Sequence, residues 1–326
     1  MNANAQTFGR QALRVLSKQK AIAAIIAMLI IMLFPDSNFY SLANFSNVFR
    51  AATPNLIIAF GVTLVVICRG CDLSVGSVMA MAGILAITLL NAGLPIWLAI
   101  LLAILSGSFV GFINGFLVVV QKTEAFIITL GMGMLVQGVA LQLTDGNPVT
   151  PDAAHFDSFW AVSNGSVFGI PNITLIMVGL GIITFLLLRF TSFGRNCYAL
   201  GGDYEVAEHS GINVVRTKWI AFVLSGTLSA ISGVLLASRM TTGLAFVGVE
   251  VPLLVNCSVV IGGTSFAGGV GGVVASFVGV MVMQFLRNCM DMIMIDRYVQ
   301  QMVLGIVIVA IISLDCYAIK RKKEAV

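Results

Sequence analysis

The sequence predicts an all-α polytopic membrane protein that forms a single transmembrane domain over residues 1–326. Hydrophobic residues make up 59% of the chain and charged residues only 10%, whereas about 25% of residues in soluble domains are charged. The mean hydropathy is +1.02. Long apolar runs such as 98–105 and 304–314 predict helices. Strands of a membrane barrel would alternate apolar and polar residues instead.

Hydropathy predicts about ten membrane spans. Some are too short to cross a hydrocarbon core of about 30 Å upright, and others are long enough to tilt. The first follows a basic segment, residues 1–18, and no small-x-small cleavage site comes after it, so we interpret it as an uncleaved signal anchor. The predicted spans cover roughly residues 19–34, 51–68, 75–91, 95–120, 125–143, 173–190, 218–238, 249–263, 270–288 and 298–316.

The distribution of Lys and Arg predicts that both termini are cytoplasmic. With the N-terminus inside, fourteen basic residues lie on the inner side, including the basic tail 317–326, and only four lie outside. Cytoplasmic loops of membrane proteins carry the excess of basic residues, so the reverse orientation is disfavoured. The net charge of +4 is spread among loops rather than gathered in one patch, so no nucleic-acid partner is expected.

Two longer segments separate spans in the middle of the chain. The outer one, 144–172, holds three Asp, three Pro and Trp160 without Lys or Arg, which predicts a loop with a short interfacial helix. In the inner one, 191–217, we expect Gly201-Gly202 to break the chain and Asp203 to cap a helix of about seven residues. A helix this short is not stable alone in water. It either docks on a partner or is a transient helix in a solvated connector.

Small residues four apart predict close packing of helices at three places. One ridge is formed by Gly107, Gly111 and Gly115, a second by residues 225, 229, 233 and 237, and a third by residues 268, 272 and 276. We interpret these ridges as structural.

The chain lacks the motifs of common catalytic and nucleotide-binding sites. No Lys follows a Gly, so the GxxxxGK[ST] loop is absent and the chain is not predicted to bind ATP in that way. Only His155 and His209 are available for zinc binding or His-based catalysis. We therefore expect no catalytic residue, no metal site and no cofactor bound by this chain.

Acidic residues and cysteines narrow the function further. Acids within spans usually mark ion coupling, but here they are predicted at span ends or in loops, at positions 72, 124, 250, 291, 296 and 315. An ion-driven carrier is therefore poorly supported. Cys68 and Cys71 have CxxC spacing, but no second pair or His follows, and we interpret the six cysteines as small buried hydrophobic residues.

The stretch RGCDLSVGS, 69–77, interrupts two apolar runs and allows two interpretations. In the first it is a tight turn, in which Asp72 caps the next helix through a backbone N–H near Val75. In the second a broken helix lines a pathway and Asp72 and Ser74 offer polar groups to a passing solute. Non-helical backbone at membrane depth would have to be shielded from lipid.

Three ordered motifs resemble those of the permease subunits of ribose-type ABC sugar importers. CDLSVGSVMAMAG at 71–83 is similar to their DLSVGS segment, FGRNCYALGGDYEVAEHSGINVVRTK at 193–218 to their cytoplasmic loop, and VVIGGTSFAGGVGG at 259–272 to their VIGGTS segment. The resemblance extends over about residues 40–320. It implies the fold shared by permeases for ribose, branched-chain amino acids and vitamin B12.

The resemblance also implies the partners and the location. Two permease subunits, identical or different, form the pathway in a bacterial inner membrane. Separate cytoplasmic ABC ATPase subunits hold ATP and Mg, and a periplasmic binding protein delivers a sugar. The short inner helix would couple the permease to the ATPase, with Tyr204 and Val206 as buried anchors. The residues so assigned are Gly201, Gly202, Asp203, Tyr204, Glu205, Val206, Ala207, Glu208, Ser210 and Gly211.

The chain departs from the family pattern at three places. Arg69-Gly70-Cys71 stands where GGI is usual, so the bulky Arg69 replaces a Gly at a place where backbones pack closely. Glu124 stands where prolines are common. The segment 249–256, VEVPLLVN, replaces a more usual E-L-D-A-I-A-A. We expect these changes to affect either which solute is transported or which partner subunit is bound.

A sugar pathway should have hydroxyl, amide and aromatic groups, because sugars present many hydroxyls and apolar ring faces. Each polar group within the spans could equally form a helix–helix hydrogen bond worth about 0.6 kcal/mol. The alternatives left open are the same machinery for another small solute, such as a branched-chain amino acid, a nucleoside or a signalling molecule, and a facilitator that needs no ATP. The candidate pathway residues are Asp72, Ser74, Asn114, Gln137, Asn256, Gln284 and Asn288.

Overall fold

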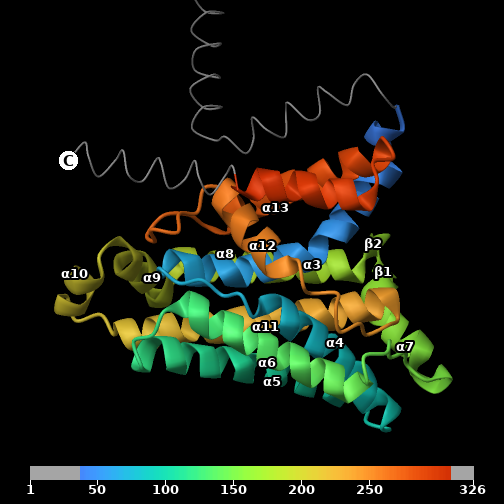
Figure 1. Ribbon diagram of the computed structural model, residues 1–326, viewed down its shortest axis with the longest axis horizontal. Coiled ribbons are helices and arrows are strands. Elements are labelled where there is room, and N and C mark those ends of the chain that lie inside the picture. The colour runs from blue at the N-terminus through green and yellow to red at the C-terminus, as the bar shows by residue number, and fades with distance from the viewer. Residues whose placement is uncertain (1–36, 310–326) are drawn as a thin grey trace, which may run out of the picture.

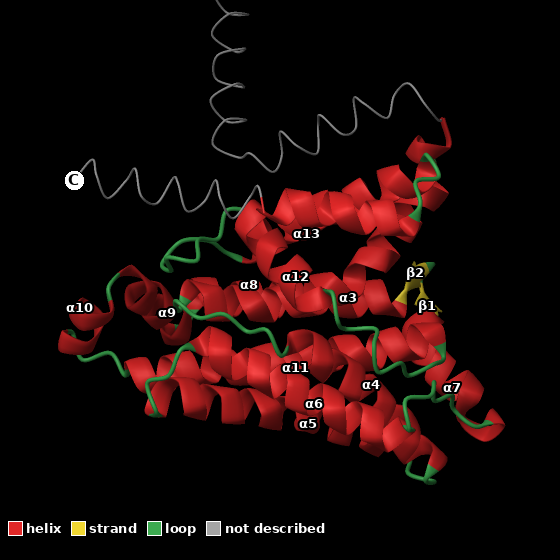
Figure 2. Cartoon of the chain, in the orientation of Figure 1, coloured by secondary structure: helices red, strands yellow, loops and turns green. Residues whose placement is uncertain are grey.

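The computed structural model describes residues 37–309 of the chain. Within this part, three shorter apolar helices accompany six helices that are long and apolar enough to cross a membrane (Figure 2). The long helices are α3 (Leu42–Ile67), α5 (Ile96–Gly115) with its π-helical extension η2 (Phe116–Val120), α6 (Ala125–Thr144), α8 (Asn172–Phe190), α11 (Val214–Met240) and α13 (Val273–Met292). The shorter ones are α4 (Val75–Asn91), α12 (Val251–Ile261) and Arg297–Val309.

These helices agree with the predicted polytopic membrane fold. Each predicted span from 51–68 onward corresponds to one of them, whereas the first, 19–34, lies outside the described residues, so the count of ten stays a prediction. The largest boundary difference is at α3, which begins at Leu42. Its first turns are polar and lie outside the apolar run, and the Ser41 hydroxyl caps them by accepting a hydrogen bond from the Asn44 amide at 3.1 Å.

Short elements gather at the two ends of the molecule (Figure 1). At one end lie α9 (Ser192–Gly202) and α10 (Tyr204–His209); at the other lie α7 (Ala153–Asn164) and a hairpin of β1 (Ser166–Val167) and β2 (Ile170–Pro171), while η1 (Ser37–Tyr40) precedes α3. The short helix predicted within 144–172 is present as α7. The 27 residues of α11 rise by about 40 Å, which sets the distance between the two ends.

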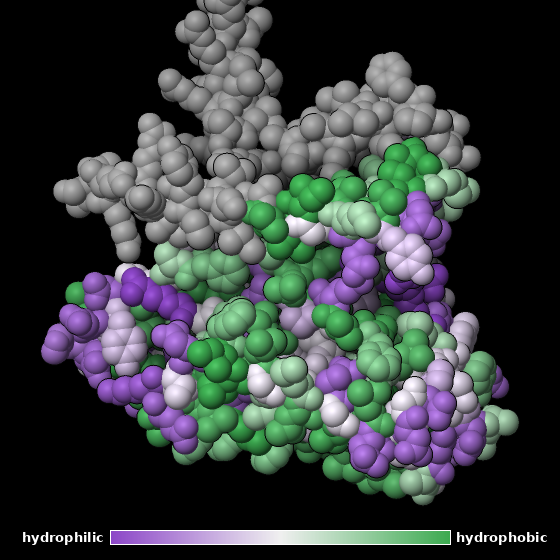
Figure 3. All heavy atoms as spheres, viewed as in Figure 1, coloured by the Kyte–Doolittle hydropathy of each residue, from purple (hydrophilic) through white to green (hydrophobic). Residues whose placement is uncertain are grey.

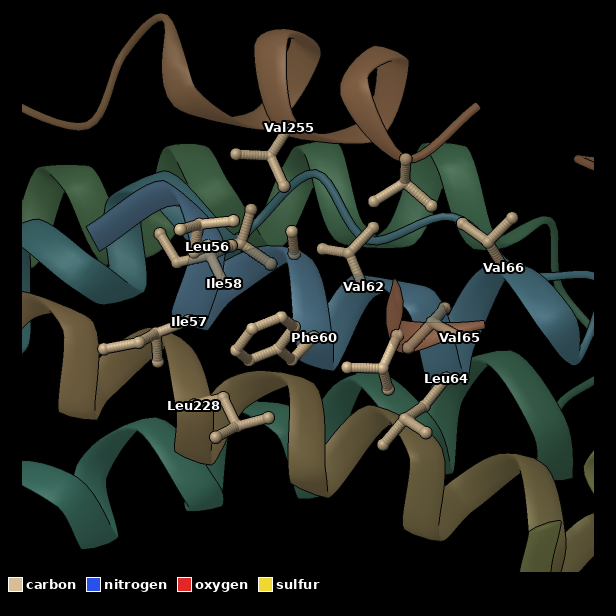
Figure 4. Close-up of a cluster of buried hydrophobic side chains, with 14 of the residues drawn as sticks. Leu56, Ile57, Ile58, Phe60, Val62, Leu64, Val65, Val66, Leu228 and Val255 are labelled. Atoms are coloured by element: carbon tan, nitrogen blue, oxygen red, sulfur yellow. The ribbon is translucent and has the colours of Figure 1, made fainter. Parts of the chain in front are cut away.

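Helix α3 is the centre of the hydrophobic core. Of its most apolar window 83% is buried, compared with 22% for α6 and for α8. Leu56 and Phe60 of α3 pack in a cluster with Leu228 of α11 and Val255 of α12 (Figure 4). The apolar outer faces of α6 and α8 suit contact with lipid. Figure 3 shows apolar residues over much of the middle of the visible face and hydrophilic residues gathered toward the two ends.

The first predicted ridge brings α5 into close contact with α11. A Cβ atom built on Gly107 would lie 2.5 Å from the Ala230 Cβ, and one built on Gly111 would lie 2.4 Å from the Phe222 carbonyl oxygen. Both distances are shorter than side chains tolerate. The glycines are therefore required for backbone approach, as small residues are at membrane helix interfaces in general.

Replacing Gly111 with leucine is expected to destabilise the protein by about 1–3 kcal/mol or more, because the side chain must force α5 away from α11. Gly138→Leu in α6 is the matched control, since nothing lies within 4 Å of a Cβ at that position. Thermal unfolding in detergent should show a lower midpoint for Gly111→Leu alone. Equal midpoints for the two variants would contradict the assigned interface.

Candidate functional site

The segment between α3 and α4 returns into the protein interior without helical structure. Asp72 is fully buried and Ser74 is 1% exposed. The Asp72 carboxylate contacts Ser225, which lies eleven residues beyond the start of α11 and so about 16 Å along that helix. Asp72 thus lies in a loop, as predicted, but this loop is fully buried rather than at the surface. Asp72 lies between helices in sequence but deep between them in space.

Three hydrogen bonds satisfy the Asp72 carboxylate. One oxygen accepts from the Ser74 amide at 3.0 Å and from the Ser74 hydroxyl at 2.7 Å, and the other accepts from the Ser225 hydroxyl at 2.7 Å. The hydrogen bond from the Ser74 backbone amide resembles the predicted cap, although the predicted donor was an amide near Val75. Hydroxyl and amide donors stabilise a buried carboxylate without a cation, and this arrangement ties α4 to α11.

Neighbouring helices complete the cluster around Asp72. The Asn114 amide of α5 donates to the Ser74 hydroxyl at 2.9 Å, and the Asn256 amide of α12 donates to the Asp72 carbonyl at 3.1 Å. Thr129 of α6 accepts from the Leu73 amide at 3.0 Å. The Asn114 side-chain oxygen is buried without a hydrogen-bond partner among the described residues. Four predicted pathway residues, Asp72, Ser74, Asn114 and Asn256, thus meet in one polar cluster.

The other three predicted pathway residues lie elsewhere. The Gln137 amide donates to the Ala245 carbonyl at 2.6 Å and ties α6 to the segment after α11. Asn288 exchanges two hydrogen bonds of 3.0 Å with Asn44, which joins α13 to the start of α3. Gln284 lines a hollow between α3 and α13. The role of all seven residues in translocation stays a prediction.

The inner helix predicted after Gly202 is present as α10. The Asp203 carboxylate accepts from the Val206 amide at 3.1 Å, as its predicted role as a cap requires, and Glu205 occupies the first turn. Tyr204 is 37% exposed and Val206 61% exposed, whereas Ala207 is buried. The helix therefore rests on the protein at Ala207, while Tyr204 and Val206, which are two residues apart and do not share a face, both expose apolar surface.

The segment before α10 is helical, which the sequence interpretation missed. Gly201 and Gly202 are the last residues of α9 rather than a break in the chain. Gly201 is glycine for a different reason: a Cβ there would lie 1.9 Å from the Ile67 carbonyl oxygen. The buried residues Gly194, Cys197 and Leu200 lie three positions apart, as on one face of a helix. This spacing is the sequence feature from which α9 could have been predicted.

Two further side chains hold the end with α9 and α10 together. The Tyr198 hydroxyl of α9 donates to the Gly271 carbonyl at 2.9 Å, and burial raises the pKa of the Tyr198 phenol. Arg69 donates through Nε to the Gly201 carbonyl at 2.9 Å and to the Ala267 carbonyl at 2.8 Å. It also donates through Nη2 to the Gly202 carbonyl.

Arg69 therefore plays a part that the sequence did not indicate. The departure from glycine at this position does not prevent close packing, because the backbone adopts a φ of 54° and the side chain points to α9. Its guanidinium lies on carbonyls at the C-terminus of α9, where a cation is favoured. One residue thus joins the end of α3, the base of α10 and the loop 262–272 between α12 and α13.

Sequence comparison places the chain among bacterial transport proteins. It is 36% identical over 305 residues to the ribose import permease protein RbsC of Haemophilus influenzae, covering 93% of this chain and 94% of that protein. It is 35% identical over 286 residues to the L-arabinose transport system permease protein AraH of Escherichia coli K12, covering 88% and 86%. The D-allose transport system permease protein AlsC of the same organism is 32% identical over 295 residues, covering 90% and 89%.

The family assignment rests on most of the chain. The family model described as "Branched-chain amino acid transport system / permease component" matches residues 44–312. No solved structure matches this chain. The buried polar break between α3 and α4, the three motifs and nearly all residues of the described helices fall within the matched region. The protein belongs to the family of branched-chain amino acid transport system permease components.

Proposed function

We propose that this protein is the membrane-spanning permease subunit of an ATP-driven ABC importer for a monosaccharide such as ribose, arabinose or allose. The relatives that cover most of the chain are named for these three sugars. The observation that carries the mechanism is α10, a six-residue helix with two exposed apolar side chains at one end of the molecule. Such a helix suits insertion into a cleft of a soluble partner.

In the proposed complex the end with α10 faces the cytoplasm and both termini lie on that side. Cytoplasmic ATPase subunits bind and hydrolyse ATP with Mg, and a periplasmic binding protein delivers the sugar to the opposite end. A second permease subunit completes the pathway. When the ATPase subunits close on ATP, α10 moves with them as a rigid body and re-aims the helices mounted on it.

Reconstitution tests the proposed function directly. We expect proteoliposomes with the permease, its ATPase and the sugar-loaded binding protein to take up labelled D-ribose, L-arabinose or D-allose only with ATP. Uptake by the permease alone, at the same rate without ATP, would identify a facilitator instead. Uptake of leucine or a nucleoside but none of the sugars would keep the machinery and change the solute.

Replacing Tyr204 with arginine is expected to abolish ATP-driven uptake, because a charged side chain would have to enter an apolar cleft unpaired. Co-purification should show that the variant inserts in the membrane but no longer holds the ATPase. Phe168→Arg is the matched control, since Phe168 is an aromatic residue with 101% relative exposure in the hairpin at the opposite end. Wild-type uptake by Tyr204→Arg would remove α10 from the coupling mechanism.

A further inference from the structure

A hollow with both polar and apolar walls lies at the end of the molecule opposite α10. Its volume is about 740 Å³, and its walls include Met240, the last residue of α11, and Asn147 from the segment after α6. Since α10 precedes α11 and the hollow lies at the far end of that helix, the two are about 40 Å apart. The lining residues that the argument uses are Asn55, Phe246, Glu250, Arg287, Arg297 and Gln301.

A second hollow of about 310 Å³ continues the first. It shares Asn55, Glu250, Arg287, Arg297 and Gln301 with the larger one and adds Gln284, Asp291 and Gln300. The two acids and the two arginines have cancelling formal charges. The site therefore offers many donors and acceptors without a net charge, which disfavours a phosphate or a cation and suits an uncharged polar ligand.

The ion pair within the hollow also limits the ligand. Arg287 Nη2 lies 3.4 Å from Glu250 Oε2, and their side chains are 29% and 52% exposed. A zwitterionic amino acid would have to separate these two groups to bind both. A hydroxyl group both donates and accepts, so neighbouring sugar hydroxyls can bridge the arginine and the glutamate while the pair stays intact.

An apolar platform faces the same space. Phe246 is 65% exposed and lines the larger hollow together with Leu244 and Val247. The pyranose or furanose ring has apolar C–H faces besides its hydroxyl edges, and an exposed aromatic ring covers such a face. Small-molecule sites in general combine apolar walls with a few placed polar groups in volumes of about 300–1,000 Å³. Both features occur here.

We propose that this outer hollow is a monosaccharide-receiving site, in which Glu250, Arg287 and Asn55 bind the hydroxyl groups and Phe246 stacks on the ring. The site rests on the proposed function, because it lies at the end where a binding protein would release sugar. Of the residues expected from sequence to form the pathway, it contains Gln284. The cluster around Asp72 belongs to a deeper and more enclosed region.

Protection of an introduced cysteine tests the site without requiring transport. Gln301 and Phe168 are both exposed, so Gln301→Cys and Phe168→Cys should react with a water-soluble thiol reagent in the assembled complex in nanodiscs, above the background of the native cysteines. At about ten times its Kd, D-ribose, L-arabinose or D-allose should slow labelling of Gln301→Cys about tenfold. Phe168→Cys should react at the same rate with and without sugar, and L-leucine should protect neither.

Two results would overturn the site. Labelling of Gln301→Cys that none of the three sugars slows would show that sugar does not enter, and no labelling in the sugar-free complex would show that the hollow is closed. Because labelling does not depend on ATP, these results are distinct from failure of the proposed function, which is loss of ATP-driven uptake by the wild-type complex.

The platform has a separate test. Phe246→Ala is expected to lower ATP-driven uptake about threefold to tenfold at saturating loaded binding protein, while ATP hydrolysis without binding protein and the thermal unfolding midpoint stay at wild-type values. Phe168→Ala, the control, should transport normally. Uptake by Phe246→Ala equal to that of the control would contradict the stacking role.

Discussion

Asp72→Ala is expected to destabilise the protein by about 3 kcal/mol or more. The substitution leaves the Ser74 amide, the Ser74 hydroxyl and the Ser225 hydroxyl without their acceptor in a fully buried site. Each unsatisfied buried donor costs about 1–3 kcal/mol, and hydroxyl rotation recovers part of this. The loss should appear as a lower midpoint of thermal unfolding in detergent and as less protein inserted in the membrane.

Asp72→Asn separates the structural role of the side chain from a role for its charge. Asparagine has nearly the same shape and keeps one oxygen acceptor, and its amide can donate to a serine hydroxyl that has turned round. We expect a loss of about 1 kcal/mol, well below that of alanine. Asp157→Ala in the exposed part of α7 controls for removal of an acid and should unfold like the wild type.

The two variants also decide between the interpretations of the 69–77 stretch. If Asp72→Asn is nearly as stable as the wild type and transports sugar normally, Asp72 holds α4 against α11 and its charge has no part in translocation. If the same variant is stable but transports poorly, the carboxylate acts on the solute. An alanine variant as stable as the wild type would contradict the structural role altogether.

The membrane class and the spans could be predicted from sequence because both depend on local composition. An apolar run long enough to cross the bilayer is a property of neighbouring residues. The cap at Asp203 was predictable for the same reason, because its carboxylate accepts from the backbone amide of Val206, only three residues further along the chain. The short helix α7 was likewise marked by turn residues on either side.

The convergence around Asp72 could not be predicted in this way. Its partners Ser225 and Asn256 lie 153 and 184 residues away along the chain, and nothing local indicates which serine meets which acid. Position 201 illustrates the same limit. Its glycine was interpreted as a break in the chain, but it is required because the Ile67 carbonyl packs against it from a distant helix.

Helix α9 was missed because its apolar residues are few. A helix that lies across the end of a bundle buries only one narrow side, and here that side is formed by small residues, Gly194 and Cys197 among them. Hydropathy averages do not detect such a stripe. The pathway assignments were limited for a different reason, since an amide in a span suits a helix contact and a sugar contact equally.

Arg69→Ala is expected to uncouple ATP hydrolysis from sugar uptake. In the wild type the Arg69 side chain bonds to the Gly201 and Gly202 carbonyls at the base of α10 and to the Ala267 carbonyl in the loop before α13. The Gly269 amide adds a bond of 3.0 Å to the Ile67 carbonyl. These contacts link α10 to α3 and to the α12–α13 loop, and in the proposed complex they would pass movement of the ATPase to several helices at once.

The expected magnitude follows from the type of bond. Hydrogen bonds to a charged group contribute about 1.5–3 kcal/mol when buried, but Arg69 is exposed and solvent screening lowers this. A net loss of about 1.4 kcal/mol corresponds to a tenfold change. We therefore expect about tenfold less sugar moved per ATP hydrolysed. Alanine keeps the backbone cost of the positive φ unchanged, so the comparison isolates the side chain.

The contrast with Tyr204→Arg makes this prediction specific. Arg69→Ala leaves the exposed side chains of α10 unchanged, so this variant should still bind the ATPase in co-purification, whereas Tyr204→Arg should not. Arg69→Lys keeps the charge but cannot bond to three carbonyls with a planar group, and we expect it to restore only part of the coupling. Wild-type coupling in Arg69→Ala would show that α10 moves the membrane helices without this link, through the packing of α9 against α8 and α11 alone.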